Sequence, residues 1–116
     1  MLAPLRITER TIDDILILQL DGQLVFDEGA RILRDHLKAS LAAGARHLLL
    51  DLHNVTYVDS GGIGALVEMH TLVLRMGGRL LLTRPSRSAE RVLNITHLWS
   101  VLEVFEEEET AVREMH

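Results

Sequence analysis

Three short and almost wholly apolar runs constrain the fold of this chain more than any other feature of its sequence. They are Ile15–Leu20, His47–Leu52 and Arg79–Thr83. Runs of this kind are typical of strands in a parallel sheet that is covered on both faces. A helical pattern from about Glu28 to Ala43 separates the first two runs, and another from Ser60 to about Met76 separates the last two. The alternation predicts parallel strands joined by right-handed crossovers, with helices covering the sheet.

Further elements are expected at both ends of this pattern. Weak alternation from Leu5 to Arg10 and a turn at Asp13-Asp14 predict an N-terminal β-hairpin. Asp27 is expected to cap the first long helix. After Pro85, a short helix capped by Ser86 or Ser88 is expected, followed by a strand from Val101 to Phe105 and a helix from Glu106 to Met115. The sequence therefore predicts an α/β fold: one domain over residues 1–116, with a mixed, mostly parallel sheet, an N-terminal hairpin and about four covering helices.

Composition excludes several classes of function. With 116 residues, 47% of them hydrophobic and 25% charged, the chain has the composition of one globular domain. A net charge of −5 and only four aromatic residues argue against nucleic acid as a direct partner. The absence of cysteine excludes disulfides and thiolate metal sites, and the six histidines lack the spacing of a metal site. No membrane span, signal peptide or bound metal is expected, and the location expected is cytoplasmic.

The stretch from Tyr57 to Gly64 carries most of the functional information. Gly61, Gly62 and Gly64 fall at the start of a predicted helix, where each glycine gives up roughly 1 kcal/mol of helix propensity. Bare backbone at such a place indicates the close approach of a partner, an anion or a neighbouring element. Spacing alone leaves two interpretations open. Either Ser60 only caps the helix while the glycines ease packing, or the first turn receives a partner or a phosphate.

Recognisable enzyme motifs do not occur in this stretch. The residue two before Ser60 is Val58, so the glycine-flanked serine of α/β-hydrolases is absent. The pair Gly62-x-Gly64 is followed neither by the glycine spacing of a dinucleotide fingerprint nor by that of a P-loop, so no cofactor is expected. An enzyme using Ser60 or Asp59 is the alternative from another functional class. It is disfavoured because no base lies at a recognisable spacing, and we predict no catalytic residue.

The block Asp59-Ser60-x-Gly62-Ile63-Gly64, which follows the apolar strand His47–Leu52, resembles the signature of STAS domains, specifically those of bacterial anti-sigma factor antagonists. The resemblance extends over most of the chain, through Gly22-Gln23-Leu24 and Gly78–Leu82. It implies that Ser60 is phosphorylated by a serine kinase of the histidine-kinase-like ATPase type, which is itself the anti-sigma factor. In that family the unphosphorylated protein binds the kinase and frees the sigma factor, and a PP2C-type phosphatase restores it.

The resemblance thus predicts a non-enzymatic binding module that is switched by phosphorylation and changes partners. Contacts to the partner are expected at Asp59, Ser60, Gly61, Gly62, Gly64 and Met69. Two positions depart from the family pattern. Val25 stands where an acidic residue is common, and Gly61 where Ser or Thr is common. The alternative within the fold is a STAS scaffold subunit of a lipid-transport or stress-signalling assembly that is not phosphorylated.

Met69 is expected among these contacts because the predicted helix Ser60–Met76 has a second apolar stripe, which also contains Met76. An apolar arc this wide exceeds what one face of a sheet usually covers. Two interpretations stay open: neighbouring helices bury the second stripe, or its methionines contact a partner, for which flexible thioether side chains are suited.

Overall fold

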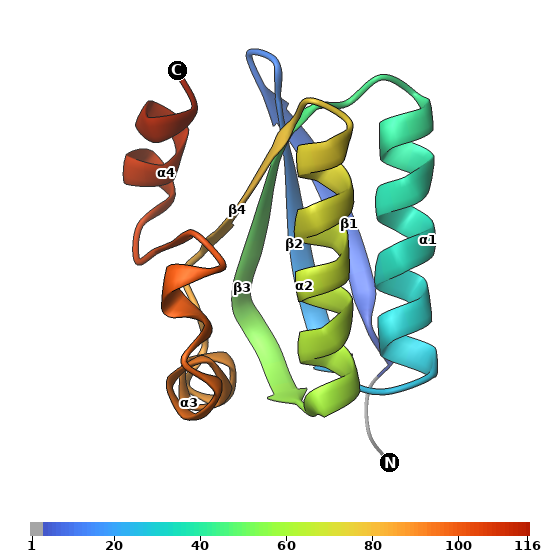
Figure 1. Ribbon diagram of the computed structural model, residues 1–116, viewed down its shortest axis with the longest axis vertical. Coiled ribbons are helices and arrows are strands. Elements are labelled where there is room, and N and C mark those ends of the chain that lie inside the picture. The colour runs from blue at the N-terminus through green and yellow to red at the C-terminus, as the bar shows by residue number, and fades with distance from the viewer. Residues whose placement is uncertain (1–3) are drawn as a thin grey trace.

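A five-stranded sheet with helices on both faces forms the framework of the computed structural model, which describes residues 4–116 (Figure 1). The strands lie in the sheet in the order in which they occur along the chain: β1 (Arg6–Ile12), β2 (Ile15–Leu24), β3 (His47–Val58), β4 (Arg79–Thr83) and β5 (Val104–Phe105). β1 pairs with β2 in the antiparallel sense, and all other neighbours are parallel. The N-terminal hairpin and the mixed, mostly parallel sheet predicted from the sequence are confirmed.

Within the described residues, four α-helices and one 3-10 turn complete the fold: α1 (Glu28–Ala42), α2 (Ser60–Arg75), α3 (Arg87–Thr96), the turn η1 (Leu98–Ser100) and α4 (Glu108–Met115). In Figure 1, α1 and α2 stand side by side in front of the sheet, and α4 lies on the other side of the strands. The Nε atom of Arg34 on α1 donates a hydrogen bond of 2.9 Å to the Glu68 carboxylate on α2, which ties the two helices together. Ser86 caps α3 by accepting a hydrogen bond of 3.2 Å from the Ala89 amide, as expected.

The core is divided by the sheet into two unequal parts, because successive side chains of a strand point to opposite faces. Leu48 and Leu50 belong to the larger cluster, which α1 and α2 cover. Leu49 belongs to the smaller cluster, which Ala111 and Met115 of α4 close. As expected, the apolar runs of the sequence are continuous because both faces of the central strands are covered.

The strand β3 is twelve residues long and continues to Val58, so the predicted strand His47–Leu52 covers only its first half. Its second half pairs with the last residues of β2, after irregularities in the register. Val55 and Val58 are buried there, whereas the polar residues between them are exposed. Because only one side of this half is covered, it lacks the continuous apolar run that identified the first half. The sheet therefore holds the chain in place up to the residue before Asp59.

Two other expectations about local structure were also wrong. Asp27 makes no capping hydrogen bond through its side chain within the described part of the chain. The Ala30 amide instead donates a hydrogen bond of 2.9 Å to the backbone carbonyl of Val25, so a backbone acceptor satisfies this amide of the first turn. The strand expected from Val101 is limited to Val104–Phe105, because η1 takes up the preceding chain and the sheet pairing begins only at Val104.

The C-terminal segment is tied to the sheet through Arg79. Its Nε and Nη2 atoms donate hydrogen bonds of 3.1 and 2.6 Å to the two carboxylate oxygens of Glu103, and Nη1 donates one of 2.9 Å to the Glu114 carbonyl on α4. The hydrogen bond from Arg79 lowers the pKa of Glu103 below its ordinary value, and the same bond raises the pKa of Arg79. A two-point arginine–carboxylate contact therefore joins β4 to the segments that follow it.

Candidate functional site

Ser60 is the first residue of α2 and is exposed. The helix α2 begins at the end of the sheet where β3 stops (lower end of Figure 1). The residue that caps the helix is Asp59, whose Oδ1 atom accepts a hydrogen bond of 2.9 Å from the Gly62 amide. The expectation that Ser60 itself caps the helix is therefore wrong. Because the longer carboxylate side chain of the preceding residue performs the capping, the Ser60 hydroxyl is left for another role.

The Asp59 carboxylate also fixes the segment between β2 and α1. The Phe26 amide donates to both of its oxygens, at 2.9 Å to Oδ1 and 3.0 Å to Oδ2. The Asp59 amide in turn donates to the Leu24 carbonyl at 3.4 Å. Asp59 thus joins the end of β2 to the start of α2. Its carboxylate is committed to these internal bonds, while its predicted contact with a partner stays a prediction.

Two of the three glycines are explained by packing within the chain. A Cβ atom on Gly62 would lie 2.0 Å from the Leu24 carbonyl oxygen, and one on Gly61 would lie 2.5 Å from the Cβ atom of Phe26. No real Cβ atom tolerates such distances, so the start of α2 approaches the end of β2 closely only because both residues lack side chains. Gly61, which departs from the family pattern, therefore leaves the space that its neighbour Phe26 occupies.

Gly64 is different, because a Cβ atom placed on it would meet no atom within 4 Å among the described residues. It is exposed, one turn beyond Ser60 on the helix. Packing inside this chain gives no reason for a glycine there. A role for Gly64 in the approach of a partner stays a prediction.

Met69 is fully buried, with 0% of its surface exposed, in the cluster between the sheet and the two helices. The prediction that Met69 contacts a partner was wrong, and the alternative that neighbouring elements bury the second stripe is confirmed for this residue. The stripe is buried because α1 packs beside α2 over the sheet. The last two members of the stripe are less buried: Leu72 is half-buried, and Met76, which directly follows α2, is exposed.

The electrostatics at Ser60 favour an anion. The first turn of α2 contains no acidic residue, and its amides carry the partial positive charge of a helix N-terminus. A phosphate attached to Ser60 would therefore add its charge at an end of the helix that tolerates it. Asp59 is the nearest carboxylate along the sequence, and hydrogen bonds from the Phe26 and Gly62 amides already offset part of its charge.

Phe26 is the residue of this region that the sequence reasoning missed. Its side chain is 75% exposed, although it is large and apolar. It lies directly against the first turn of α2, since a Cβ atom on Gly61 would lie 2.5 Å from the Cβ atom of Phe26. A signal for it was present in the sequence, since Phe26 is one of only four aromatic residues and directly precedes Asp27, the expected cap of a helix.

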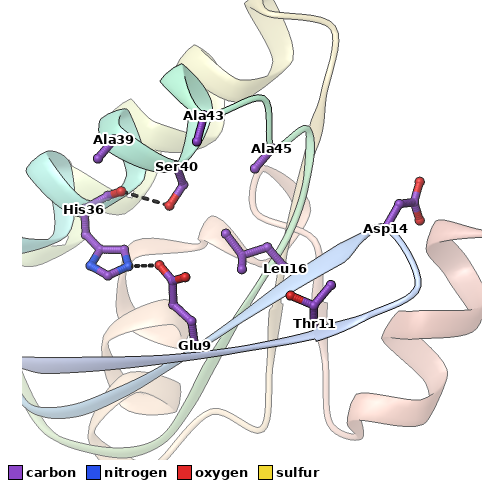
Figure 2. Close-up of a pocket in the computed structure, with 9 residues that line it drawn as sticks. All are labelled: Glu9, Thr11, Asp14, Leu16, His36, Ala39, Ser40, Ala43 and Ala45. Carbon is purple, nitrogen blue, oxygen red and sulfur yellow. Dashed lines mark hydrogen bonds and ion pairs between the residues drawn. The ribbon is translucent and has the colours of Figure 1, made fainter.

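A separate hollow of about 440 Å³ lies between the hairpin and the C-terminal half of α1 (Figure 2). Leu16 and small residues such as Ala39 and Ala43 line it. Across its opening, His36 of α1 is hydrogen-bonded to Glu9 of β1. The Ser40 hydroxyl in its wall donates to the His36 carbonyl at 3.0 Å and is satisfied by that bond. None of the residues predicted to form the functional site lines this hollow.

In residues 4–116, no group of three or more His, Asp or Glu side chains has an arrangement that could hold a metal ion. No helix in the same range has the length and apolar character required to cross a membrane.

The fold and the site together describe a small α/β domain with an exposed serine at a tightly packed, carboxylate-capped start of a helix. The family model of the STAS domain matches residues 6–111. The chain therefore belongs to the STAS domain family, as its sequence motif indicated.

Relatives with similar sequences are named as anti-sigma factor antagonists. The anti-sigma-B factor antagonist of Bacillus subtilis is 32% identical over 84 residues, which cover 72% of this chain and 76% of that protein. The anti-sigma F factor antagonist of Paenibacillus polymyxa is 23% identical over 101 residues, covering 87% of this chain and 86% of the other.

Solved structures agree with the fold. An anti-sigma factor antagonist from Mycobacterium paratuberculosis has a TM-score of 0.83 at 18% identity, covering 99% of this chain and 98% of that one. The antagonist SpoIIAA in its unphosphorylated form has a TM-score of 0.76 at 18% identity, covering 94% and 95% of the two chains. Its phosphorylated form has a TM-score of 0.71, covering 96% and 100%. At 18% identity, the similarity to these three structures shows a shared fold.

Proposed function

We propose that this chain is an anti-sigma factor antagonist whose binding is switched by phosphorylation of Ser60. The observation that carries the proposal is the exposed Ser60 at the first turn of α2, where Asp59 performs the capping and leaves the hydroxyl available. The relatives named as anti-sigma factor antagonists support the same role.

The partner proposed is an anti-sigma factor that is also a serine kinase of the histidine-kinase-like ATPase type. The unphosphorylated chain binds this kinase and thereby releases a sigma factor. A phosphatase of the PP2C type removes the phosphate from Ser60 and restores binding. In this cycle the chain supplies a hydroxyl and a surface, and the kinase supplies the catalytic groups.

The physical basis of the switch is a change of charge and size at one point. A phosphate on Ser60 adds about −1.5 to −2 charges and a tetrahedral group at neutral pH. The amides at the start of α2 tolerate that charge, so the fold persists. A partner surface fitted to a hydroxyl beside bare glycines would instead meet bulk, together with added negative charge next to Asp59. The switch therefore acts on binding and leaves folding intact.

The test is phosphorylation in a purified system. The chain is incubated with ATP and, one at a time, each kinase of this type encoded in the same genome, and the modified residue is identified by mass spectrometry. We expect one phosphate on Ser60 of the wild type and none on Ser60→Ala, which should still bind the kinase. A PP2C-type phosphatase should restore binding of the phosphorylated chain.

Two results would count against this function. If no kinase of the set binds or phosphorylates the wild type, the anti-sigma role fails. If a non-kinase assembly retains the chain equally with and without a phosphate on Ser60, the chain is a STAS scaffold subunit, which is the alternative left open by the sequence.

A further inference from the structure

Phe26 presents the most exposed large apolar side chain of the described residues, with 75% of its surface accessible. It follows β2 at the same end of the sheet at which α2 begins. An exposed phenylalanine contributes nothing to the core of its own chain. Aromatic side chains are nevertheless among the residues that supply most of the binding energy when a partner buries them.

The backbone of Phe26 is held in a fixed position. Its amide donates to both oxygens of Asp59, the residue that caps α2. Its Cβ atom lies so close to Gly61 that a side chain on Gly61 would overlap it. Because the ring projects from a fixed base, less conformational entropy is lost when a partner covers it.

Phe26 and Ser60 belong to one continuous surface. Gly61, the residue that touches Phe26, directly follows Ser60 in the chain, and both Phe26 and Ser60 are exposed. A partner that binds at Ser60 therefore has an exposed phenylalanine next to the neighbouring residue of α2. The preceding residue, Val25, is apolar and half-buried, whereas the exposed Asp27 and Glu28 follow Phe26. The surface beside Ser60 is thus an apolar projection with acidic residues on one side.

We infer that Phe26 anchors the kinase partner by inserting its ring into an apolar pocket that adjoins the site for Ser60 and has basic residues at its rim. This inference rests on the proposed function, because it concerns the partner that takes Ser60. Phe26 determines affinity and the choice of partner, and it takes no part in phosphate transfer. Asp59 and Gly61 are positioning residues: Asp59 holds the backbone of Phe26, and Gly61 leaves room for its side chain.

The experiment measures binding by calorimetry to the kinase that phosphorylates Ser60 in the experiment above. Phe26→Ala should bind at least about tenfold more weakly than the wild type, and Phe26→Leu should recover part of the loss. The matched control is Leu74→Ala. Leu74 is also apolar and is 52% exposed on α2, but it lies about 21 Å along the helix from Ser60. The control should bind like the wild type.

A second readout separates docking from a structural effect. In the phosphorylation of Ser60, Phe26→Ala should raise KM for the chain at least about tenfold while kcat stays within about twofold of the wild type. Its melting temperature should stay within a few degrees of the wild-type value, because the side chain is exposed.

The outcomes distinguish this inference from the proposed function. Equal affinity of the wild type and Phe26→Ala, or an equal loss in Leu74→Ala, overturns the role of Phe26 and leaves the Ser60 switch intact. If no kinase binds the wild type, the proposed function itself fails, and the role of Phe26 fails with it.

Discussion

The Asp59 carboxylate accepts hydrogen bonds from the amide of Phe26, 33 residues earlier in the chain, at 2.9 and 3.0 Å. Its Oδ1 atom also accepts the 2.9 Å bond from Gly62 that caps α2. One side chain therefore connects the end of β2 with the start of the helix that carries Ser60. The geometry of the candidate site depends on this connection.

Loss of the Asp59 carboxylate should destabilise the protein. Asp59→Ala removes a helix cap and a charge-assisted hydrogen bond together, so we expect the free energy of unfolding to fall by about 2–3 kcal/mol. Asp59→Asn keeps an acceptor and should lose less. Urea denaturation measures both values. Asp35→Ala, at an exposed position on α1, is the control and should change stability by less than about 0.5 kcal/mol. A loss in Asp59→Ala no larger than in this control would contradict the connecting role.

Gly62 and Gly64 should respond to alanine in opposite directions. The Cβ atom of Gly62→Ala would meet the Leu24 carbonyl at 2.0 Å, so the helix must shift, at a cost of roughly 2 kcal/mol or more. At Gly64 the space is open among the described residues, so Gly64→Ala should stabilise the protein by about 0.5–1 kcal/mol through helix propensity. Thermal unfolding followed by circular dichroism checks both changes. If the two substitutions change stability equally, the close approach to Leu24 is not the reason for a glycine at Gly62.

Gly64 also tests the surface on which a partner is proposed to dock. A leucine at this exposed position should leave the melting temperature within a few degrees of the wild-type value, since no atom of the described chain opposes it. If the kinase approaches the bare helix surface, Gly64→Leu should weaken its binding at least about tenfold, which corresponds to about 1.4 kcal/mol. Calorimetry on folded samples measures the affinity. Normal binding by Gly64→Leu would remove Gly64 from the proposed surface.

The switch at Ser60 predicts a separation of folding from binding. Ser60→Asp places a negative charge at the start of α2, where it is tolerated, so the variant should fold normally. Its binding to the cognate kinase should weaken by about 3–4 kcal/mol, a several-hundredfold change in affinity, whereas Ser60→Ala should bind like the wild type. Equal affinity of Ser60→Asp and the wild type in calorimetry would refute the electrostatic part of the switch.

The contact between Arg79 and Glu103 predicts how stability depends on pH. The hydrogen bond from Arg79 lowers the pKa of Glu103 in the folded protein below its ordinary value of 4.5. The stabilisation from the charged pair is therefore fully present above about pH 4.5 and is lost as the pH falls through the lowered pKa of the folded state. Because both side chains are partly exposed to solvent, the effect should be less than about 1 kcal/mol.

Glu103→Gln is the matched variant for this effect. The difference in unfolding free energy between the wild type and Glu103→Gln should be constant near neutral pH and should shrink below about pH 4, because Glu103 then becomes protonated as the protein unfolds. Urea denaturation between about pH 2 and 7 measures it. A difference that does not change with pH would mean that the charge of Glu103 contributes nothing.

Local sequence patterns were sufficient for most of the architecture. Continuous apolar runs identified the central strands, and helical spacing identified the helices on either side of Ser60. Burial on two faces produces a continuous apolar run, and burial along one stripe produces helical spacing of apolar residues. The motif Asp59-Ser60-x-Gly62-Ile63-Gly64 also placed Ser60 correctly at the first turn of a helix. Each of these features depends on residues close together in the chain.

The features that sequence reasoning missed depend on residues that meet only in the folded protein. The second half of β3 is a strand because β2 pairs with it, although its own residues have no continuous apolar run. Met69 is buried because α1 packs beside α2, and spacing along one helix does not report what lies beside it. Asp59 caps the helix and holds Phe26 because β2 ends next to α2. The sequence by itself thus determined where the strands, the helices and the serine lie. Only the tertiary structure decided which glycines face the chain's own backbone and which aromatic ring stands beside the serine, because those properties depend on distances between segments that are far apart in the sequence.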